Sequence, residues 1–95
     1  MVDEGQQKIQ DGVEELGKLE EIVAGWRKSY SRLVDESGPD ESLCLDFQGE
    51  IDTMVLPYLR RLFETGHIDP TQMSRFLEFC SDQIKDLYNR MQEEA

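Results

Sequence analysis

Apolar residues in this chain recur at steps of three and four in three stretches, with polar or charged residues at most positions between them. Such spacing places the apolar side chains on one face of an α-helix. It predicts helices over about residues 6–35, 39–65 and 70–92. No stretch alternates with the two-residue period of a strand, so an all-α fold is expected. The apolar seams are Ile9, Leu16, Leu19, Val23, Trp26, Tyr30 and Leu33, then Cys44, Phe47, Ile51, Met54, Tyr58 and Leu62, and finally Met73, Leu77, Cys80, Ile84, Leu87 and Met91.

The stretch from Met54 to Phe63 differs from the rest, because its apolar residues cover nearly the whole circumference of a helix. Such a helix must be covered on most sides, which predicts that the other helices pack around the middle one. Pro57 lies inside this stretch, removes a backbone hydrogen bond and crowds the carbonyl of Thr53. The middle helix is therefore expected to kink or to break near Pro57, and the sequence leaves both outcomes open.

The segment between residues 35 and 41 contains the signals of a helix end followed by a helix start. Gly38 can adopt the left-handed backbone that closes a helix, and Pro39 suits the first turn of the next one. Residues 1–5 precede the helical pattern, so we expect a frayed N-terminus.

The segment between residues 65 and 72 carries the clearest local signal in the chain. Gly66 suits the end of the middle helix, and Asp69 suits the N-cap of the last one. Gln72 follows Asp69 by three residues, which is the spacing of a capping box. A helix start close to residue 70 is therefore expected.

Gly12, Gly17 and Gly25 interrupt the first helix, and each weakens it by up to about 1 kcal/mol relative to alanine. Glycines on a long helix either permit close approach of another backbone or are tolerated at the surface. We favour tolerance at the surface.

Three helices joined by short breaks predict an antiparallel up-down-up bundle, in a single domain spanning residues 1–95. The charges support this orientation, because the first and second helices each begin acidic and end basic. Each exposed ion pair contributes only about 0–1 kcal/mol, so the pattern selects an orientation more than it stabilises the fold. The expected pairs are Arg60 and Arg61 with Glu14 and Glu15, and Arg27 and Lys28 with Asp46 and Glu50.

Composition and charge narrow the classes of function. The 95 residues include 10 basic and 21 acidic side chains and carry a formal net charge of −11, so we expect no binding to nucleic acid or to an anionic membrane surface. The chain lacks the run of about 18 apolar residues that a membrane-spanning helix needs. Its acidic N-terminus does not resemble a secretory or transit signal, which favours a cytoplasmic protein.

The sequence shows no constellation typical of an enzyme, a metal site or a cofactor site, and we expect none of the three. His67 is the single histidine and lies in a turn, so we expect it to be exposed or to cap a helix end. Cys44 and Cys80 share no CxxC spacing, and we expect two reduced, buried thiols that are too far apart for a disulfide.

Apolar residues beyond those that three helices need provide the main indication of function. Either a wide core absorbs them, or they form a patch that binds a second copy or another protein. Phe76 and Phe79, one helical turn apart, are the candidate anchors of such a patch. The other candidate interface residues are Leu56, Leu59, Phe63 and Tyr88.

We therefore expect a non-enzymatic, cytoplasmic module that acts by protein–protein interaction, with a homodimer as the leading hypothesis. The alternative is an acidic inhibitor, immunity-like or antitoxin-like, that masks a basic surface of its partner. This alternative rests on the net charge of −11 and on the segment 35–52, in which every charged residue is acidic.

Overall fold

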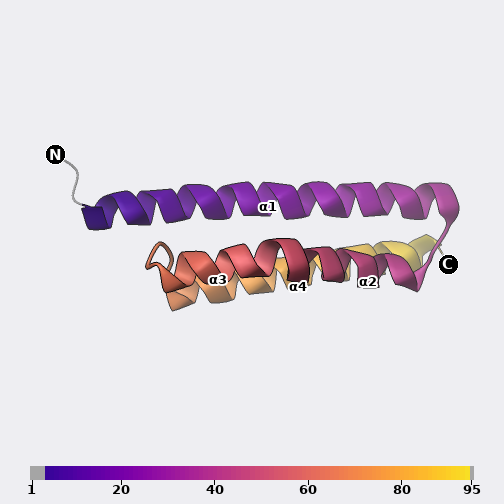
Figure 1. The fold of residues 1–95 in the computed structure, drawn as a ribbon. Coiled ribbons are helices and arrows are strands. Elements are labelled where there is room, and N and C mark those ends of the chain that lie inside the picture. The colour runs from indigo at the N-terminus through magenta and orange to yellow at the C-terminus, as the bar shows by residue number, and fades with distance from the viewer. Residues whose placement is uncertain (1–3, 95) are drawn as a thin grey trace.

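A computed structural model describes residues 4–94, which form three long helical rods with no strand among them (Figure 1). The first rod is α1, Glu4–Ser37, and the third is α4, Pro70–Glu94. The second rod consists of α2, Glu41–Glu50, a π-helical segment, η1, Ile51–Val55, and α3, Leu56–Glu64. The expected all-α, three-helix fold is confirmed. The fraying expected at residues 4 and 5 is wrong, because both are helical, and residues 1–3 lie outside the described part.

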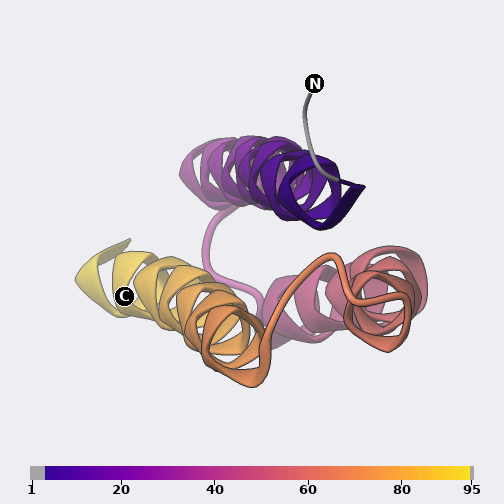
Figure 2. The same cartoon turned by 90° about the vertical axis from the view of Figure 1, so that its left-hand side faces the viewer.

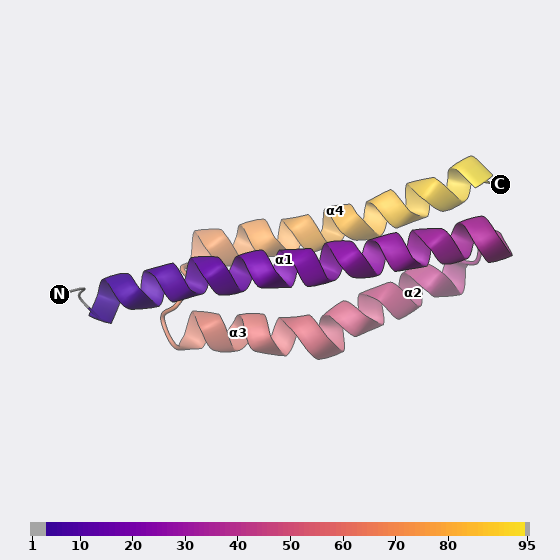
Figure 3. The same cartoon turned by 90° about the horizontal axis from the view of Figure 1, so that it is seen from above.

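The three rods lie side by side and alternate in direction (Figure 1 and Figure 3). The second rod runs back along α1, and α4 runs in the direction of α1 again. Seen end-on, α1 lies on one side of the bundle, with α4 and the second rod on the other (Figure 2). The bundle measures 56 × 20 × 18 Å and its radius of gyration is 15.6 Å. A compact domain of this length has a radius of gyration of roughly 12 Å, so this molecule is elongated.

The second rod changes helix type at its centre. The backbone N–H of Leu56 donates to the carbonyl of Ile51, five residues back, where an α-helix would reach back four. Pro57 follows and has no N–H, so it cannot donate to the carbonyl of Thr53. The disturbance predicted at Pro57 is therefore a widened π turn, with α-helix continuing on both sides. Figure 3 shows the bend of the rod between α2 and α3.

The π turn rotates α3 relative to the seam expected from the sequence. One additional residue turns the following helix by about 100°, the angle that a residue spans in an α-helix. Met54 and Tyr58, expected inside, are 67% and 41% exposed. The prediction that the stretch 54–63 is covered on most sides is wrong, because only one face is buried. That face consists of Ile51, Val55, Leu59 and Leu62.

The core draws on all three rods, and among the described residues it contains no polar or charged side chain. Three further seam positions were wrong. Ile9, near the start of α1, is 59% exposed. Leu33 on α1 is 42% exposed beside the buried Val34, and Leu77 on α4 is 39% exposed beside the buried Phe76. Each apolar face is wide, so the neighbouring helix decides which of two adjacent residues it covers. The core residues are Leu19, Val23, Val34, Phe47, Ile51, Val55, Leu59, Leu62, Ile68, Phe76, Cys80, Leu87 and Met91.

The turn between α1 and α2 begins with Gly38, whose φ of 87° closes α1 in the left-handed conformation, as predicted. Asp40 is the N-cap of α2, and its carboxylate accepts a hydrogen bond from the backbone N–H two residues further on, at 3.0 Å. The helix therefore begins at Glu41, and Pro39 precedes it instead of occupying its first turn.

The turn between α3 and α4 follows the predicted pattern closely. Gly66 has a φ of 78° and ends α3. The carboxylate of Asp69 accepts from the backbone N–H of Gln72 at 2.7 Å, and the side-chain oxygen of Gln72 accepts from the backbone N–H of Asp69 at 2.9 Å. This reciprocal pair is the predicted capping box, and α4 begins at Pro70.

The same turn packs directly against the backbone of α1 at Gly12. A Cβ atom added at Gly12 would lie 1.9 Å from the carbonyl oxygen of His67. Gly12 therefore permits close approach of another backbone, and the favoured interpretation of surface tolerance was wrong for it. Tolerance does apply to Gly17 and Gly25, where an added Cβ would meet nothing within 4 Å.

Among the described residues, none of the ion pairs expected between the first and second helices forms. Hydrogen bonds from two tyrosines to the expected glutamates form in their place. Tyr58 donates to Glu15, and Tyr30 donates to Glu50. The π turn explains the contact at α3, because it brings Tyr58 to the edge that faces α1. The antiparallel direction shown in Figure 1 therefore does not depend on the expected ion pairs.

Candidate interaction surface

Two of the six side chains expected at an interface lie in the core. Leu59 is 0% exposed and Phe76 is 2% exposed. Leu59 turns inward because of the π turn. Phe76 replaces Leu77 on the buried face of α4 and contacts the ring of Phe79, with the ring centroids 5.9 Å apart. The prediction of Leu59 and Phe76 as surface anchors is therefore wrong for the folded chain.

The other four predicted residues reach the surface but do not form one patch. Leu56 and Phe79 are half-buried and pack against the core. Phe63, just before the turn into α4, is 39% exposed, and Tyr88 is 49% exposed. Tyr88 lies 18 residues after the start of α4, which corresponds to about 27 Å along the helix. It borders a depression at the far end of the bundle, beside Pro39.

Two tyrosine–glutamate hydrogen bonds link α1 to the second rod. The hydroxyl of Tyr58 on α3 donates to the carboxylate of Glu15 on α1 at 2.8 Å. At the other end, the hydroxyl of Tyr30 on α1 donates to the carboxylate of Glu50 on α2. The two bonded positions of α1 are 15 residues apart, which corresponds to about 22 Å.

Both tyrosines are held in their neutral, hydrogen-bond-donating form. Burial and the hydrogen bond to Glu50 raise the pKa of Tyr30 above its usual value. The hydrogen bond to Glu15, together with burial, raises the pKa of Tyr58. In each case ionisation would remove the donor and place a second negative charge beside the carboxylate. The two links between the rods are therefore stable across the neutral pH range.

Exposed and half-exposed apolar side chains lie between these two links along each rod. Ile22 and Trp26 lie on α1 between its two bonded residues, at spacings of seven, four and four residues, so they share that edge of the helix. Met54 lies midway between the two bonded residues of the second rod, four positions from each. Ile22 is 45% exposed and Met54 is 67% exposed, whereas Trp26 is half-buried against the core.

The charged residues between Asp35 and Leu59 are all acidic, but they do not share one face of the bundle. Asp35, near the end of α1, accepts from Arg90 of α4, and the negative charge of Asp52 acts on Cys80 of α4. Glu50 instead accepts from Tyr30 of α1. The acidic segment therefore faces both α1 and α4. The acidic residues of the segment are Asp35, Glu36, Asp40, Glu41, Asp46, Glu50 and Asp52.

His67 borders a second depression, of about 430 Å³, together with Tyr58 and Arg61. The hydroxyl of Thr65 lies 2.7 Å from the carbonyl oxygen of Arg61 and 2.6 Å from Nδ1 of His67. The Thr65 hydroxyl donates to the carbonyl of Arg61, and the direction of its hydrogen bond with His67 depends on the tautomer of the imidazole ring. His67 thus contacts the end of α3 through Thr65.

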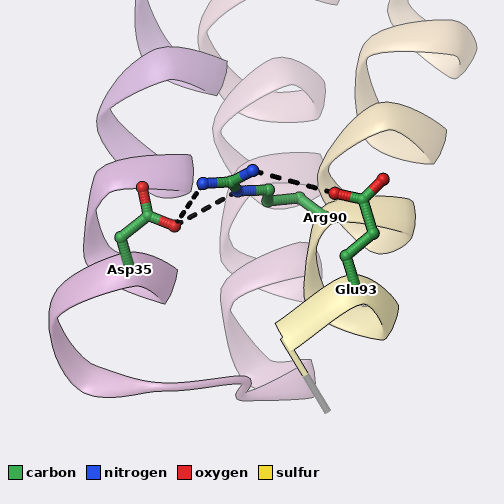
Figure 4. Close-up of polar contacts among 3 residues, drawn as sticks. All are labelled: Asp35, Arg90 and Glu93. Atoms are coloured by element: carbon green, nitrogen blue, oxygen red, sulfur yellow. Dashed lines mark hydrogen bonds and ion pairs between the residues drawn. The ribbon is translucent and has the colours of Figure 1, made fainter.

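A polar cluster joins the end of α1 to α4 (Figure 4). The Nε and Nη2 atoms of Arg90 donate to one carboxylate oxygen of Asp35, at 3.1 and 2.8 Å. The third guanidinium nitrogen, Nη1, lies 3.7 Å from the carboxylate of Glu93. These side chains are partly exposed, so each pair contributes about 1 kcal/mol or less. The cluster aligns the two parallel helices at this end of the bundle.

Both thiols are free, with Cys80 buried as predicted and Cys44 only half-buried. Burial raises the pKa of Cys80 to about 11, and Asp52 and Glu20 add to the shift. Burial also raises the pKa of Cys44, with a contribution from Glu41. A thiol that stays protonated is a poor nucleophile and a poor metal ligand. Both thiols are therefore held mainly in the protonated form at neutral pH.

Sequence reasoning missed the contact of Tyr58 with α1 and the exposure of Met54, because it assigned both residues to the buried seam. The signal was nevertheless present in Pro57, which was expected to disturb the helix at that point. The π turn there rotates the following residues, whereas a simple kink would have left the seam unchanged.

Further searches of the described structure add no site. In residues 4–94, no three His, Cys, Asp or Glu side chains gather in a way that could hold a metal ion. Within the same range, no helix is both long and apolar enough to cross a membrane. A scan against protein-family models and searches of curated proteins and of solved structures gave no match, so these comparisons indicate neither a family nor a function.

Proposed function

We propose that this chain is a non-enzymatic helical module that acts in the cytoplasm by protein–protein contact. The observation that carries the proposal is the exposure of large apolar side chains on every rod, including Ile22 on α1, Met54 on the second rod and Tyr88 on α4. Ten large apolar side chains are exposed among the described residues, and burying several of them against a partner would be favourable. The two free thiols fit the reducing conditions of the cytoplasm.

In its simplest form, the partner is a second copy of the chain. Two copies of net charge −11 repel each other, so association through apolar contacts should strengthen as salt screens this repulsion. Light scattering on a sizing column, at about 0.05 and 0.5 M salt, measures the mass directly. A dimer that Phe63→Asp or Tyr88→Asp dissociates supports self-association, and a strict monomer at high concentration rejects it.

The alternative function is to mask a basic surface of another protein, as an acidic inhibitor, immunity-like or antitoxin-like protein would. The unbroken acidic charge of residues 35–52 along α2 and η1 favours it. For this function, added salt should weaken binding, because it screens the attraction between the acidic chain and its basic partner. Self-association should instead strengthen with salt. A basic protein captured at about 0.05 M salt and released at about 0.5 M supports this function, and capture that survives salt supports apolar contact.

A further inference from the structure

We propose that the depression between α1 and the end of α3 binds a small zwitterion, a free α-amino acid, with its carboxylate on Arg61 and its ammonium group on Asp11. This binding goes beyond protein–protein contact and does not depend on it. Three observations support the proposal: the charges of both signs that line the depression, the oxygen that Asp11 leaves without a partner, and the unpaired guanidinium of Arg61.

The depression has the size of a small-molecule site and is lined by charges of both signs. Its volume is about 430 Å³, which lies within the range of about 300–1,000 Å³ that is usual for such sites. Asp11 and Glu15 of α1 and Arg61 of α3 line it. Among the described residues, no ion pair joins Arg61 to either carboxylate, although Glu15 was its expected partner. The opposite charges therefore line one hollow without neutralising each other directly.

Of the two carboxylates, Asp11 has the greater unused capacity. Both oxygens of Glu15 have partners, since Oε2 accepts from the hydroxyl of Tyr58 at 2.8 Å and Oε1 lies 3.6 Å from Nζ of Lys18. In Asp11, Oδ1 accepts from Nε2 of Gln7 at 2.9 Å. Within residues 4–94, Oδ2 of Asp11 has no partner. This oxygen is therefore available to accept from an ammonium group.

The guanidinium of Arg61 is the complementary group. In the described part of the chain it makes no hydrogen bond or ion pair, and only the backbone carbonyl of Arg61 is engaged, by Thr65. The hydrogen bond to Glu15 and burial raise the pKa of Tyr58, and the positive charge of Arg61 partly opposes that rise. A guanidinium offers five N–H donors and can bind a carboxylate through two parallel hydrogen bonds. Arg61 therefore has unused donors close to Tyr58.

A free α-amino acid matches both groups at once. Its ammonium group donates to Oδ2 of Asp11, its carboxylate accepts from Arg61, and an aliphatic side chain packs on Leu62, which also lines the depression. A molecule with only one of the two charges leaves the other group unpaired. Arg61 is exposed and Asp11 is half-buried, and exposed ion pairs contribute little, so we expect a Kd of about 1–10 mM.

The experiment titrates the isotope-labelled full chain with L-leucine and follows its amide resonances by NMR. A salt concentration of about 0.15 M screens the long-range attraction of cations to the acidic chain. We expect saturable shifts around Asp11, Arg61 and Thr65. Leucinamide, which lacks the carboxylate, and N-acetylleucine, which lacks the ammonium group, should each bind at least about fivefold more weakly than leucine.

Two pairs of variants locate the contacts. Arg61→Gln should weaken leucine binding about fivefold, whereas Arg60→Gln, at an exposed residue outside the depression, should change it less than about twofold. Asp11→Asn and Glu14→Gln form the second pair, with the same expectation. Arg61→Gln should also abolish the preference for leucine over leucinamide, and Asp11→Asn the preference over N-acetylleucine. Circular dichroism checks that each variant stays folded.

Several results would overturn the proposal. These are the absence of saturable shifts with about 50 mM leucine, binding of leucine no tighter than that of either analogue, shifts that lie away from the depression, and equal weakening by the two members of a variant pair. None of these results bears on protein–protein contact, which the light-scattering experiment tests separately.

Discussion

Replacing Gly12 by alanine tests the packing of the α3–α4 turn against α1. The added Cβ would lie 1.9 Å from the carbonyl oxygen and 2.7 Å from the carbonyl carbon of His67, and 3.3 Å from Cγ2 of Ile68. Since Cβ contacts below 3.0 Å are essentially never observed, the turn must move away by about 1 Å or more. The atoms in closest contact belong to the backbone, so no side-chain rotation relieves the overlap.

The expected effect follows from two opposing terms. Alanine favours the helix over glycine by about 1 kcal/mol, whereas forcing extra volume into a packed contact costs about 1–3 kcal/mol. Moving the turn also disturbs Ile68, which is 5% exposed, and the burial of such a side chain contributes about 1.5–3 kcal/mol. We expect Gly12→Ala to lose about 1–3 kcal/mol net, which lowers Tm by roughly 5–20 °C in a domain of this size.

Gly17→Ala and Gly25→Ala are the matched controls, because an added Cβ there meets nothing within 4 Å. Each should stabilise the chain by up to about 1 kcal/mol through helix propensity alone. Urea unfolding followed by circular dichroism measures all three variants under one condition. If Gly12→Ala is as stable as the two controls, the close approach of the turn to α1 is wrong.

Four further predictions concern the cap, the core and the thiols. Asp69→Ala should lower the free energy of unfolding by about 1 kcal/mol through loss of the capping box, as measured by urea unfolding. Leu59→Ala should cost about 2–5 kcal/mol in the same assay and Met54→Ala less than about 0.5 kcal/mol, and equal losses would contradict the rotation by the π turn. A thiol reagent should modify Cys44 before Cys80 in the native protein, and reaction of Cys80 at the same rate would refute its burial. Folding raises the pKa of the Cys80 thiol from 9.0 to about 11, so the folded state favours the protonated thiol. This preference adds to the free energy of unfolding below pH 9 and is lost as the pH rises towards 11. The free energy of unfolding of Cys80→Ala should therefore fall less over this alkaline range than that of the unmodified chain.

Local features of the fold were predictable from sequence because each depends on residues close together in the chain. The left-handed glycines at 38 and 66 and the capping box of Asp69 and Gln72 formed as predicted. A cap depends only on residues at its own helix end, so a few neighbouring residues are enough to predict it from the sequence. The three helices themselves follow from the spacing of apolar residues over many turns.

The candidate surface was not predictable to the same degree. The sequence identified the acidic segment and the surplus of apolar residues, but it assigned Phe76 and Leu59 to the surface and Met54 to the core. These assignments depend on the helix rotation, and a change of one residue in register turns a helix by about 100°. A sequence pattern with a wide apolar face does not distinguish such rotations, because several of them bury a comparable apolar area.

The sequence by itself determined that this chain forms three amphipathic helices, where they end, and that the acidic charge concentrates in residues 35–52. Only the tertiary structure decided that the carbonyl of His67 packs against Gly12 and that the π turn leaves Met54 exposed and Leu59 buried. The physical reason is the distance along the chain between the residues in contact. Helices and caps form through contacts a few residues apart, whereas packing between rods joins residues far apart in the chain, such as Glu15 and Tyr58, which are 43 positions apart.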